Sequence, residues 1–96
     1  MNYWLHPEAR EDLREAASFY RDNAGIGLSQ ALLVEFEHSI RLLLEHPQLG
    51  ARWQRRRRYV MRRFPFAVIY SVFGEQLRIL AVAHQSRRPG YWRARK

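Results

Sequence analysis

The sequence contains no cysteine and only one lysine, and each scarcity narrows the functions open to it. Without cysteine there are no disulfides, no thiol nucleophiles and few possible zinc sites, so we expect neither a metal nor a cofactor. No apolar run approaches the roughly 20 residues that a membrane span requires. The first residues also lack the basic and apolar regions of a signal peptide. We therefore expect a cytoplasmic protein without membrane contact.

Charge is abundant, but it is unevenly distributed along the chain. Residues 1–50 carry four arginines and eight acidic residues, a net charge of −4, whereas residues 51–96 carry twelve arginines and Lys96 against Glu75 alone, a net charge of +12. The guanidinium of arginine binds carboxylate and phosphate bidentately. The C-terminal half is therefore expected to attract a polyanion or an acidic protein segment and to speed its association.

The 96 residues are enough for one domain, residues 1–96, with one modest core. A short aromatic strand is expected at residues 3–6, and Pro7 then fits the first turn of a helix. Apolar residues at steps of three and four predict helices over about 8–24 and 28–46, with Glu35 facing solvent. The short link between them predicts an antiparallel helical hairpin.

The second half of the chain predicts a sheet. Residues 48–54 are expected to form a loop, and strands are expected at about 57–63, 66–73 and 76–84, the last two joined by a Gly-first hairpin turn. The order β-α-α-β-β-β predicts an α+β fold, with the helical hairpin packed on one face of a small, mostly antiparallel sheet. The expected core comprises Val68 or Ile69 and Ile79, packed against Leu13, Leu32 and Phe36. Four consecutive arginines at 55–58 indicate either a solvated face or an anion site.

The last quarter of the chain, residues 81–96, runs from an apolar strand into a polar tail. The tail carries side chains that bind phosphate and stack on bases, and its two aromatics and Pro-Gly turn favour a tail that packs on the sheet. In RNA cleavage His84 would serve as acid or base, Tyr91 would assist it, and Arg87 and Arg88 would stabilise the developing charge. Alternatively, His84 only ends the strand and hydrogen-bonds the tail, or the tail is a poorly ordered basic terminus.

Two stretches carry a resemblance to a known family. They are Tyr59–Tyr70 and Leu80–Trp92, and the second contains the pattern His-x-x-Arg-Arg-Pro-x-Tyr-Trp, which begins at His84. With the predicted layout, they resemble the RelE/ParE superfamily of type II toxins, in particular the ParE-like branch described as plasmid stabilisation proteins. The resemblance implies a growth-inhibiting toxin that a small acidic antitoxin covers and neutralises. It also implies that operator DNA is bound only through the toxin–antitoxin complex.

The superfamily has two well-known activities, and the resemblance leaves the target open. RelE-like members cleave mRNA in the ribosomal A site with scattered basic residues and usually a C-terminal tyrosine, whereas ParE-like members poison DNA gyrase. Ala67 and Ile69 stand where the mRNA-cleaving relatives tend to carry an arginine. Three hypotheses follow: a gyrase toxin, a ribosome-dependent ribonuclease, or a plain nucleic-acid-binding module without catalysis. The candidate catalytic residues are His84, Arg87, Arg88 and Tyr91, and the candidate target-binding residues are Arg62, Arg63, Trp92 and Arg93.

Overall fold

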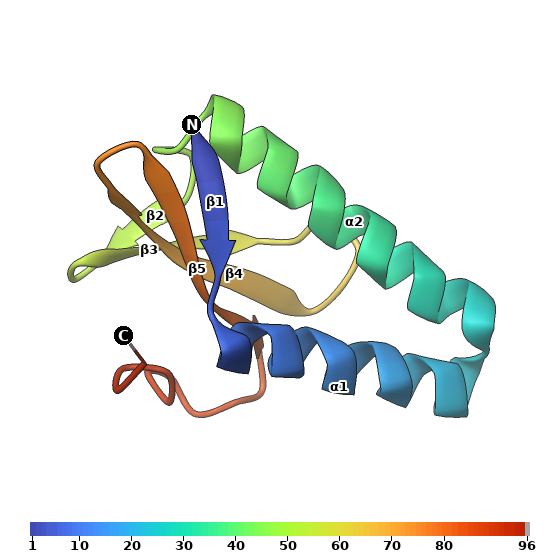
Figure 1. Cartoon of the computed structure of the whole chain (residues 1–96). Coiled ribbons are helices and arrows are strands. Elements are labelled where there is room, and N and C mark those ends of the chain that lie inside the picture. Colours follow the sequence, from blue (N-terminus) through green and yellow to red (C-terminus); the bar gives the residue numbers. More distant parts are fainter. Residues whose placement is uncertain (96) are drawn as a thin grey trace.

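A computed structural model describes residues 1–95. In that part of the chain the elements are β1 (Asn2–Leu5), α1 (Pro7–Ala24), α2 (Ile26–Glu45), β2 (Ala51–Trp53), β3 (Arg56–Val60), β4 (Phe66–Phe73) and β5 (Gln76–His84) (Figure 1). The predicted α+β fold, with a helical hairpin beside a mostly antiparallel sheet, is confirmed. Neither of the two helices in residues 1–95 has the length and apolar character that a membrane span requires.

The strands form one sheet in the order β1-β5-β4-β3-β2. β1 runs parallel to β5, and the other neighbours are antiparallel. The prediction of a loop over residues 48–54 was wrong, because Ala51–Trp53 pairs with Arg56–Arg58 as a short edge strand. The predicted strand over residues 57–63 also ends early, at Val60, because the backbone N–H groups of Arg62 and Arg63 do not bond to β4.

Those N–H groups bond to Glu35 on α2, which was wrongly predicted to face solvent. Glu35 is only 8% exposed, and its Oε2 accepts hydrogen bonds from the backbone N–H of Arg62 at 2.7 Å and of Arg63 at 3.0 Å. The Nε of Arg63 donates to Oε1 at 3.2 Å. Burial raises the pKa of Glu35, but the hydrogen bonds from Arg63 and Arg62 outweigh it and hold the pKa below its usual value. The carboxylate thus fixes the connection between β3 and β4.

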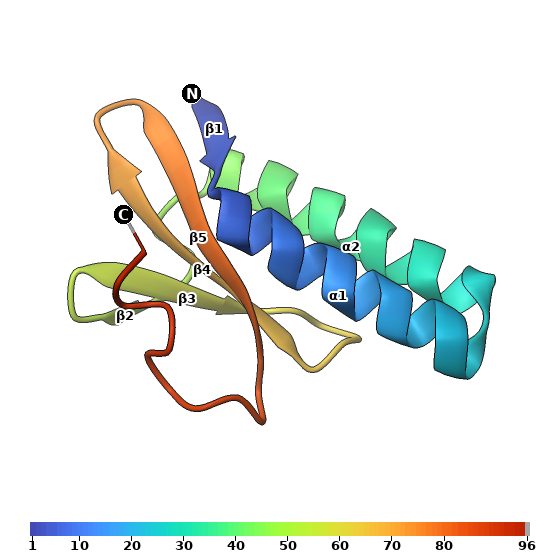
Figure 2. The same ribbon diagram turned by 60° about the horizontal axis from the view of Figure 1, so that its bottom comes forward.

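The two helices are joined by a single residue, Gly25. Its φ of 99° lies in the region that favours glycine, so the chain reverses at once and α1 and α2 run side by side (Figures 1 and 2). α1 begins at Pro7, where the Nδ1 of His6 accepts a hydrogen bond from the backbone N–H of Glu8 at 3.0 Å. This cap satisfies one of the free N–H groups at the start of the helix.

The main core lies between the helical hairpin and one face of the sheet. Val68 and Ile79 are buried there with Leu32 and Phe36, and Leu13 packs against them, as predicted. The same cluster buries Tyr70 and Leu77 from the sheet, with Ile40 and Leu43 from α2. We call this side of the sheet the helix face.

A β-bulge in β5 changes which side chains point to each face. Ile69 pairs with Ala81, and Tyr70 pairs with Ile79, so Leu80 is an extra residue between them. As a result Ile79 packs in the helix-face core, whereas Ala81 joins Ala67 and Ile69 in a second cluster on the opposite face. The C-terminal tail, Gln85–Arg95, returns across the sheet toward β2 and β3 (Figure 2).

Candidate functional site between the first helix and the tail

The tail is docked on the sheet by Trp92. This side chain is 5% exposed and packs on the second cluster, formed by Ala67, Ile69 and Ala81. Its ring meets that of Trp53 edge to face, with centroids 5.0 Å apart. Burying an indole removes a large apolar area from water, so a tail without helix or strand still holds a defined path.

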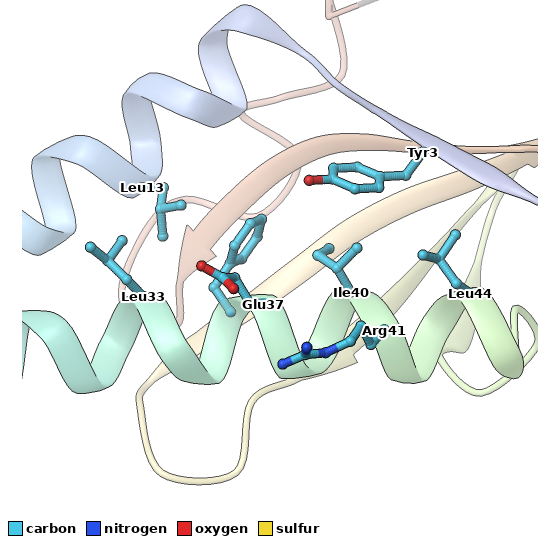
Figure 3. A pocket seen from close by; sticks show the side chains of 8 residues that line it. Tyr3, Leu13, Leu33, Glu37, Ile40, Arg41 and Leu44 are labelled. Carbon is cyan, nitrogen blue, oxygen red and sulfur yellow. The ribbon is translucent and has the colours of Figure 1, made fainter.

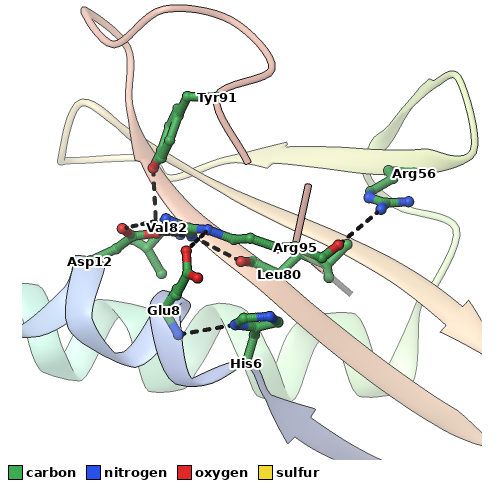
Figure 4. A network of polar contacts seen from close by, with 8 residues as sticks. All are labelled: His6, Glu8, Asp12, Arg56, Leu80, Val82, Tyr91 and Arg95. Carbon is green, nitrogen blue, oxygen red and sulfur yellow. Dashed lines mark hydrogen bonds and ion pairs between the residues drawn. The ribbon is translucent and has the colours of Figure 1, made fainter. Parts of the chain in front are cut away.

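Arg95 fastens the end of the tail to α1. Its Nη1 lies 2.6 Å from Oδ2 of Asp12, and its Nη2 lies 3.2 Å from Oδ1 (Figure 4). Both side chains are only 10% exposed. The Nε of Arg95 also donates to Glu8 at 3.0 Å. A bidentate, charge-assisted pair of this kind is among the stronger polar contacts in proteins, and we call it the Asp12–Arg95 latch.

The latch also completes the edge of β5. β1 pairs with β5 only as far as Ile79, so the edge beyond that residue has no neighbouring strand. There the backbone N–H of Val82 donates to Oδ2 of Asp12 at 3.0 Å, and the carbonyl of Leu80 accepts from Arg95 at 3.0 Å. The latch therefore supplies hydrogen bonds that a sixth strand would otherwise provide.

A cleft of about 320 Å³ opens between α1 and the tail, beside the latch. It brings together three of the four predicted catalytic residues: His84, Arg87 and Tyr91. Its other polar walls are Asp12, Glu15, Tyr20 and Ser86. The end of β5 and the turn after it deliver His84 and Arg87, and the docked tail returns Tyr91 to the same place. A guanidinium, an imidazole and a phenol therefore face one small cavity.

The Nδ1 of His84 is occupied by the tail. It accepts a hydrogen bond from the backbone N–H of Ser86 at 2.9 Å, and the hydroxyl of Ser86 lies 2.7 Å away. Because an amide N–H can only donate, Nδ1 carries no proton, and the neutral ring bears its proton on Nε2. In this arrangement the neutral imidazole offers a proton donor rather than a base. This contact matches the alternative stated from the sequence, in which His84 hydrogen-bonds the backbone of the tail.

Tyr91 is also engaged. Its hydroxyl donates to Oδ2 of Asp12 at 3.3 Å, and the guanidinium of Arg87 lies 4.0 Å from its ring. Burial raises the pKa of Tyr91 and the charge of Asp12 adds to this, whereas Arg95 and Arg87 oppose it; the net pKa is above the ordinary value. The phenol therefore keeps its proton at neutral pH and does not serve as a base.

The other candidates lie outside this cleft. Arg88 is exposed and lines a smaller, adjoining cavity of about 110 Å³, which His84, Arg87, Tyr91 and Trp92 also line. Arg93 is exposed, with its guanidinium 5.0 Å from the ring of Trp53. Trp92 is buried, a position that suits anchoring the tail better than direct contact with a target. Arg62 and Arg63 follow β3, and the Arg63 side chain is paired with Glu35.

Sequence reasoning missed the latch. Glu8 and Asp12 are one helical turn apart and therefore share a face of α1. This spacing is the one local signal of a cationic partner. Arg95 lies 83 positions from Asp12, and twelve arginines in the second half compete for the role. Within residues 1–95 there is no group of three or more His, Asp or Glu side chains arranged to hold a metal ion.

Comparison with known proteins identifies relatives of this fold. A family model described as "ParE toxin of type II toxin-antitoxin system, parDE" matches residues 3–89. Among solved structures, a chain of the "Chromosomal ParDE TA system from P. aeruginosa" superposes with a TM-score of 0.78 at 18% sequence identity, covering 88% of this chain and 95% of that chain. No curated protein matches the chain significantly.

Proposed function

Because the chain belongs to the ParE toxin family of type II toxin–antitoxin systems, we propose that it inhibits growth when free and is neutralised by a cognate antitoxin. The matched region runs from Tyr3 in β1 through the helical hairpin and the other four strands to Pro89 in the tail. The toxin assignment thus rests on the whole domain rather than on one motif.

We propose DNA gyrase as the target, inhibited by binding rather than by bond cleavage. The observation that carries this choice is the hydrogen bonding of the cleft. The Nδ1 of His84 accepts from the tail, and Tyr91 donates to Asp12 with a raised pKa. RNA cleavage needs a base to take the proton of the 2′-hydroxyl, and of the predicted catalytic residues neither His84 nor Tyr91 is poised to accept one. Arg87 and Arg88 remain available to bind a partner.

A ribosome-dependent ribonuclease is the second candidate. His84, Arg87 and Tyr91 line one cavity with the carboxylate of Glu15, so the groups for proton transfer and phosphate binding are close together. Rotation of the His84 ring away from Ser86 would free a nitrogen to act as a base. This candidate therefore predicts a strong dependence of activity on His84, whereas the gyrase proposal does not.

The antitoxin is proposed to be a small acidic protein with an amphipathic segment. A groove of about 370 Å³ runs along α2 beside β1, lined by Leu33, Phe36, Ile40 and Leu44 with Tyr3 and Leu13 (Figure 3). Tyr3 is 48% exposed there and Leu33 37%. Apolar side chains in this groove suit the apolar face of a partner helix. The strongly basic second half suits acidic residues, and their attraction is expected to accelerate association at low salt.

Induced expression tests the toxin proposal. Growth should stop when the chain is expressed alone and recover when the adjacent antitoxin gene is expressed with it. If a soluble, folded protein leaves growth unaffected, the chain is not a toxin under those conditions and the proposal fails.

Two purified assays identify the target. In a gyrase supercoiling assay the wild-type chain should inhibit, the Arg87→Ala/Arg88→Ala variant should not, and His84→Gln should retain most of the inhibition. In a ribosome assay, mRNA should stay intact. If mRNA is cut instead and His84→Gln lowers the rate by about 100-fold or more, the ribonuclease is correct. Binding to oligonucleotides with neither effect would favour the plain nucleic-acid-binding module.

A further inference from the structure

Four arginines gather at a second place, away from the cleft. A cavity of about 260 Å³ lies at the turn between β2 and β3, where the antiparallel β4 continues past the start of β3. Its polar lining is Arg52, Arg55, Arg56, Arg57, Gln48 and Ser71, and we call it the arginine notch. It shares no lining residue with the cleft or with the small cavity beside Arg88. The proposed toxin activity makes no use of it.

The wall of the notch is held by a buried tyrosine. The hydroxyl of Tyr70 donates to the carbonyl of Pro47 at 2.8 Å and accepts from the backbone N–H of Gly50 at 2.9 Å. The loop pinned in this way fixes the guanidinium of Arg57, whose Nη1 donates to the carbonyls of Gln48 at 3.2 Å and Gly50 at 2.8 Å. Arg57 therefore has a defined position before any ligand arrives, as a binding site requires.

The charge of the notch is uncompensated. No carboxylate lines it, and the ion pairs formed within residues 1–95 use other arginines: Arg14, Arg21, Arg63 and Arg95. Arg52 and Arg57 stand directly opposite each other in the β2–β3 pair. Like charges at such positions destabilise a sheet. An anion bound in the notch would offset this repulsion.

We propose that the arginine notch binds the phosphodiester backbone of a nucleic acid strand. The planar guanidinium matches phosphate oxygens in shape and charge, and several guanidiniums around one cavity suit consecutive phosphates. An acidic peptide fits less well, because protein interfaces are centred on apolar anchors, and only Pro47 and Val72 are apolar in this lining. Arg56 joins the notch to the tail, since its Nη2 lies 3.4 Å from the carbonyl of Arg95.

The test compares two double variants that remove the same charge. Arg52→Gln/Arg55→Gln alters two exposed arginines of the notch, and Arg10→Gln/Arg41→Gln alters two exposed helical arginines outside it. Binding of labelled single-stranded DNA, single-stranded RNA and duplex DNA is measured by fluorescence anisotropy over a range of salt concentrations. Each lost phosphate contact should reduce the log–log salt slope by about 0.7 for single strands. The notch variant should therefore lose about 1.4 of slope, and the control should lose almost none.

Several results would overturn the proposal. An equal loss of oligonucleotide binding in both double variants would mean that the charge of the whole molecule attracts nucleic acid without a specific site. Loss of binding in Arg87→Ala/Arg88→Ala alone would place the nucleic-acid site at the tail. Loss of poly-glutamate binding, with oligonucleotide binding unchanged, would identify an acidic protein segment as the ligand. Thermal unfolding distinguishes these outcomes from misfolding, because the notch variant removes a repulsive pair and should melt no lower than wild type. Since these measurements need no gyrase or ribosome, their outcome does not depend on the target of the toxin.

Discussion

The Asp12–Arg95 latch gives the sharpest test of how the tail is held. Replacing Arg95 with alanine leaves Asp12 in place with only the Val82 N–H and the Tyr91 hydroxyl as partners. Removing one member of a buried ion pair typically costs about 3–5 kcal/mol. Because both side chains are still 10% exposed to solvent, we expect the free energy of unfolding to fall by an amount near the lower limit, about 3 kcal/mol. For a domain of this size that lowers the Tm by roughly 12–24 °C.

A double-mutant cycle isolates the latch from the other contacts of each residue. Asp12→Ala, Arg95→Ala and the double variant are compared by thermal and urea unfolding, and the coupling energy is expected to be about 2 kcal/mol, within the usual range for contacting residues. The matched control is the pair Glu11 and Arg14. It has similar geometry, with atoms 3.0 Å apart, but the Arg14 side chain is 77% exposed and that of Glu11 is 49% exposed. Exposed pairs contribute little, so its cycle should give no measurable coupling.

Hydrogen exchange supplies a local readout of the same contact. The Val82 N–H donates to Asp12, so its protection should fall in Asp12→Ala by a larger factor than that of its neighbours within the β4–β5 pair. If the latch cycle shows no more coupling than the control cycle, and Val82 stays protected, the reasoning is refuted. The tail would then be held by Trp92 alone.

Three further changes test other parts of the structure. Folding lowers the pKa of Glu35, so its contribution to the free energy of unfolding is complete above the ordinary pKa of 4.5 and is lost as pH falls through the folded pKa. The urea midpoint of wild type should therefore fall more steeply on acidification than that of Glu35→Gln. Gly50→Ala places a Cβ 2.8 Å from the Tyr70 ring and hydroxyl and should cost about 1–3 kcal/mol by thermal unfolding. Trp92→Ala should lower the free energy of unfolding by about 3–5 kcal/mol and should also reduce growth inhibition. Replacing a tryptophan that only contacts a target from the surface would reduce growth inhibition without lowering stability.

The helices and long strands were predictable because periodicity alone determines them. The spacing of apolar residues located α1 and α2, and the apolar run at residues 66–73 located β4. β2 was not predictable in this way, since three residues on a sheet edge are too few to show an alternation. Its identity depends on pairing with Arg56–Arg58, a run whose composition resembles a solvated loop.

Polar residues that satisfy backbone groups were the harder part. Glu35 follows the pattern of an exposed helical position, but the loop after β3 brings two backbone N–H groups to it. Asp12 likewise looks like an ordinary charge near a helix start. Which loop or strand edge arrives beside such a carboxylate is a property of the tertiary fold, so a single sequence does not reveal it.

The part of the candidate site that follows the end of β5 was predictable from the sequence. His84 and Arg87 are close in sequence, and both line the cleft. Arg62 and Arg63 were grouped with them because they belong to the adjoining strands of the predicted meander. In the structure the N–H of Gln85 bonds to the carbonyl of Pro65, close to those two arginines in the sequence. The orientation of this segment was not predictable, since it depends on the hydrogen bonds that Glu35 accepts from it.

The latch connects the stability of the tail to the shape of the cleft. The same Oδ2 of Asp12 accepts from Tyr91, which lines the cleft, and from Arg95, which holds the end of the tail. Arg95 itself does not line the cleft, so it acts through the position of the tail. Arg95→Ala should therefore reduce gyrase inhibition and stability together, whereas Arg87→Ala/Arg88→Ala should reduce inhibition at nearly constant Tm. If Arg95→Ala lowers the Tm but inhibits gyrase as well as wild type at a temperature where both remain folded, the toxin does not need a fixed tail, and Arg87 and Arg88 bind their target from a flexible segment.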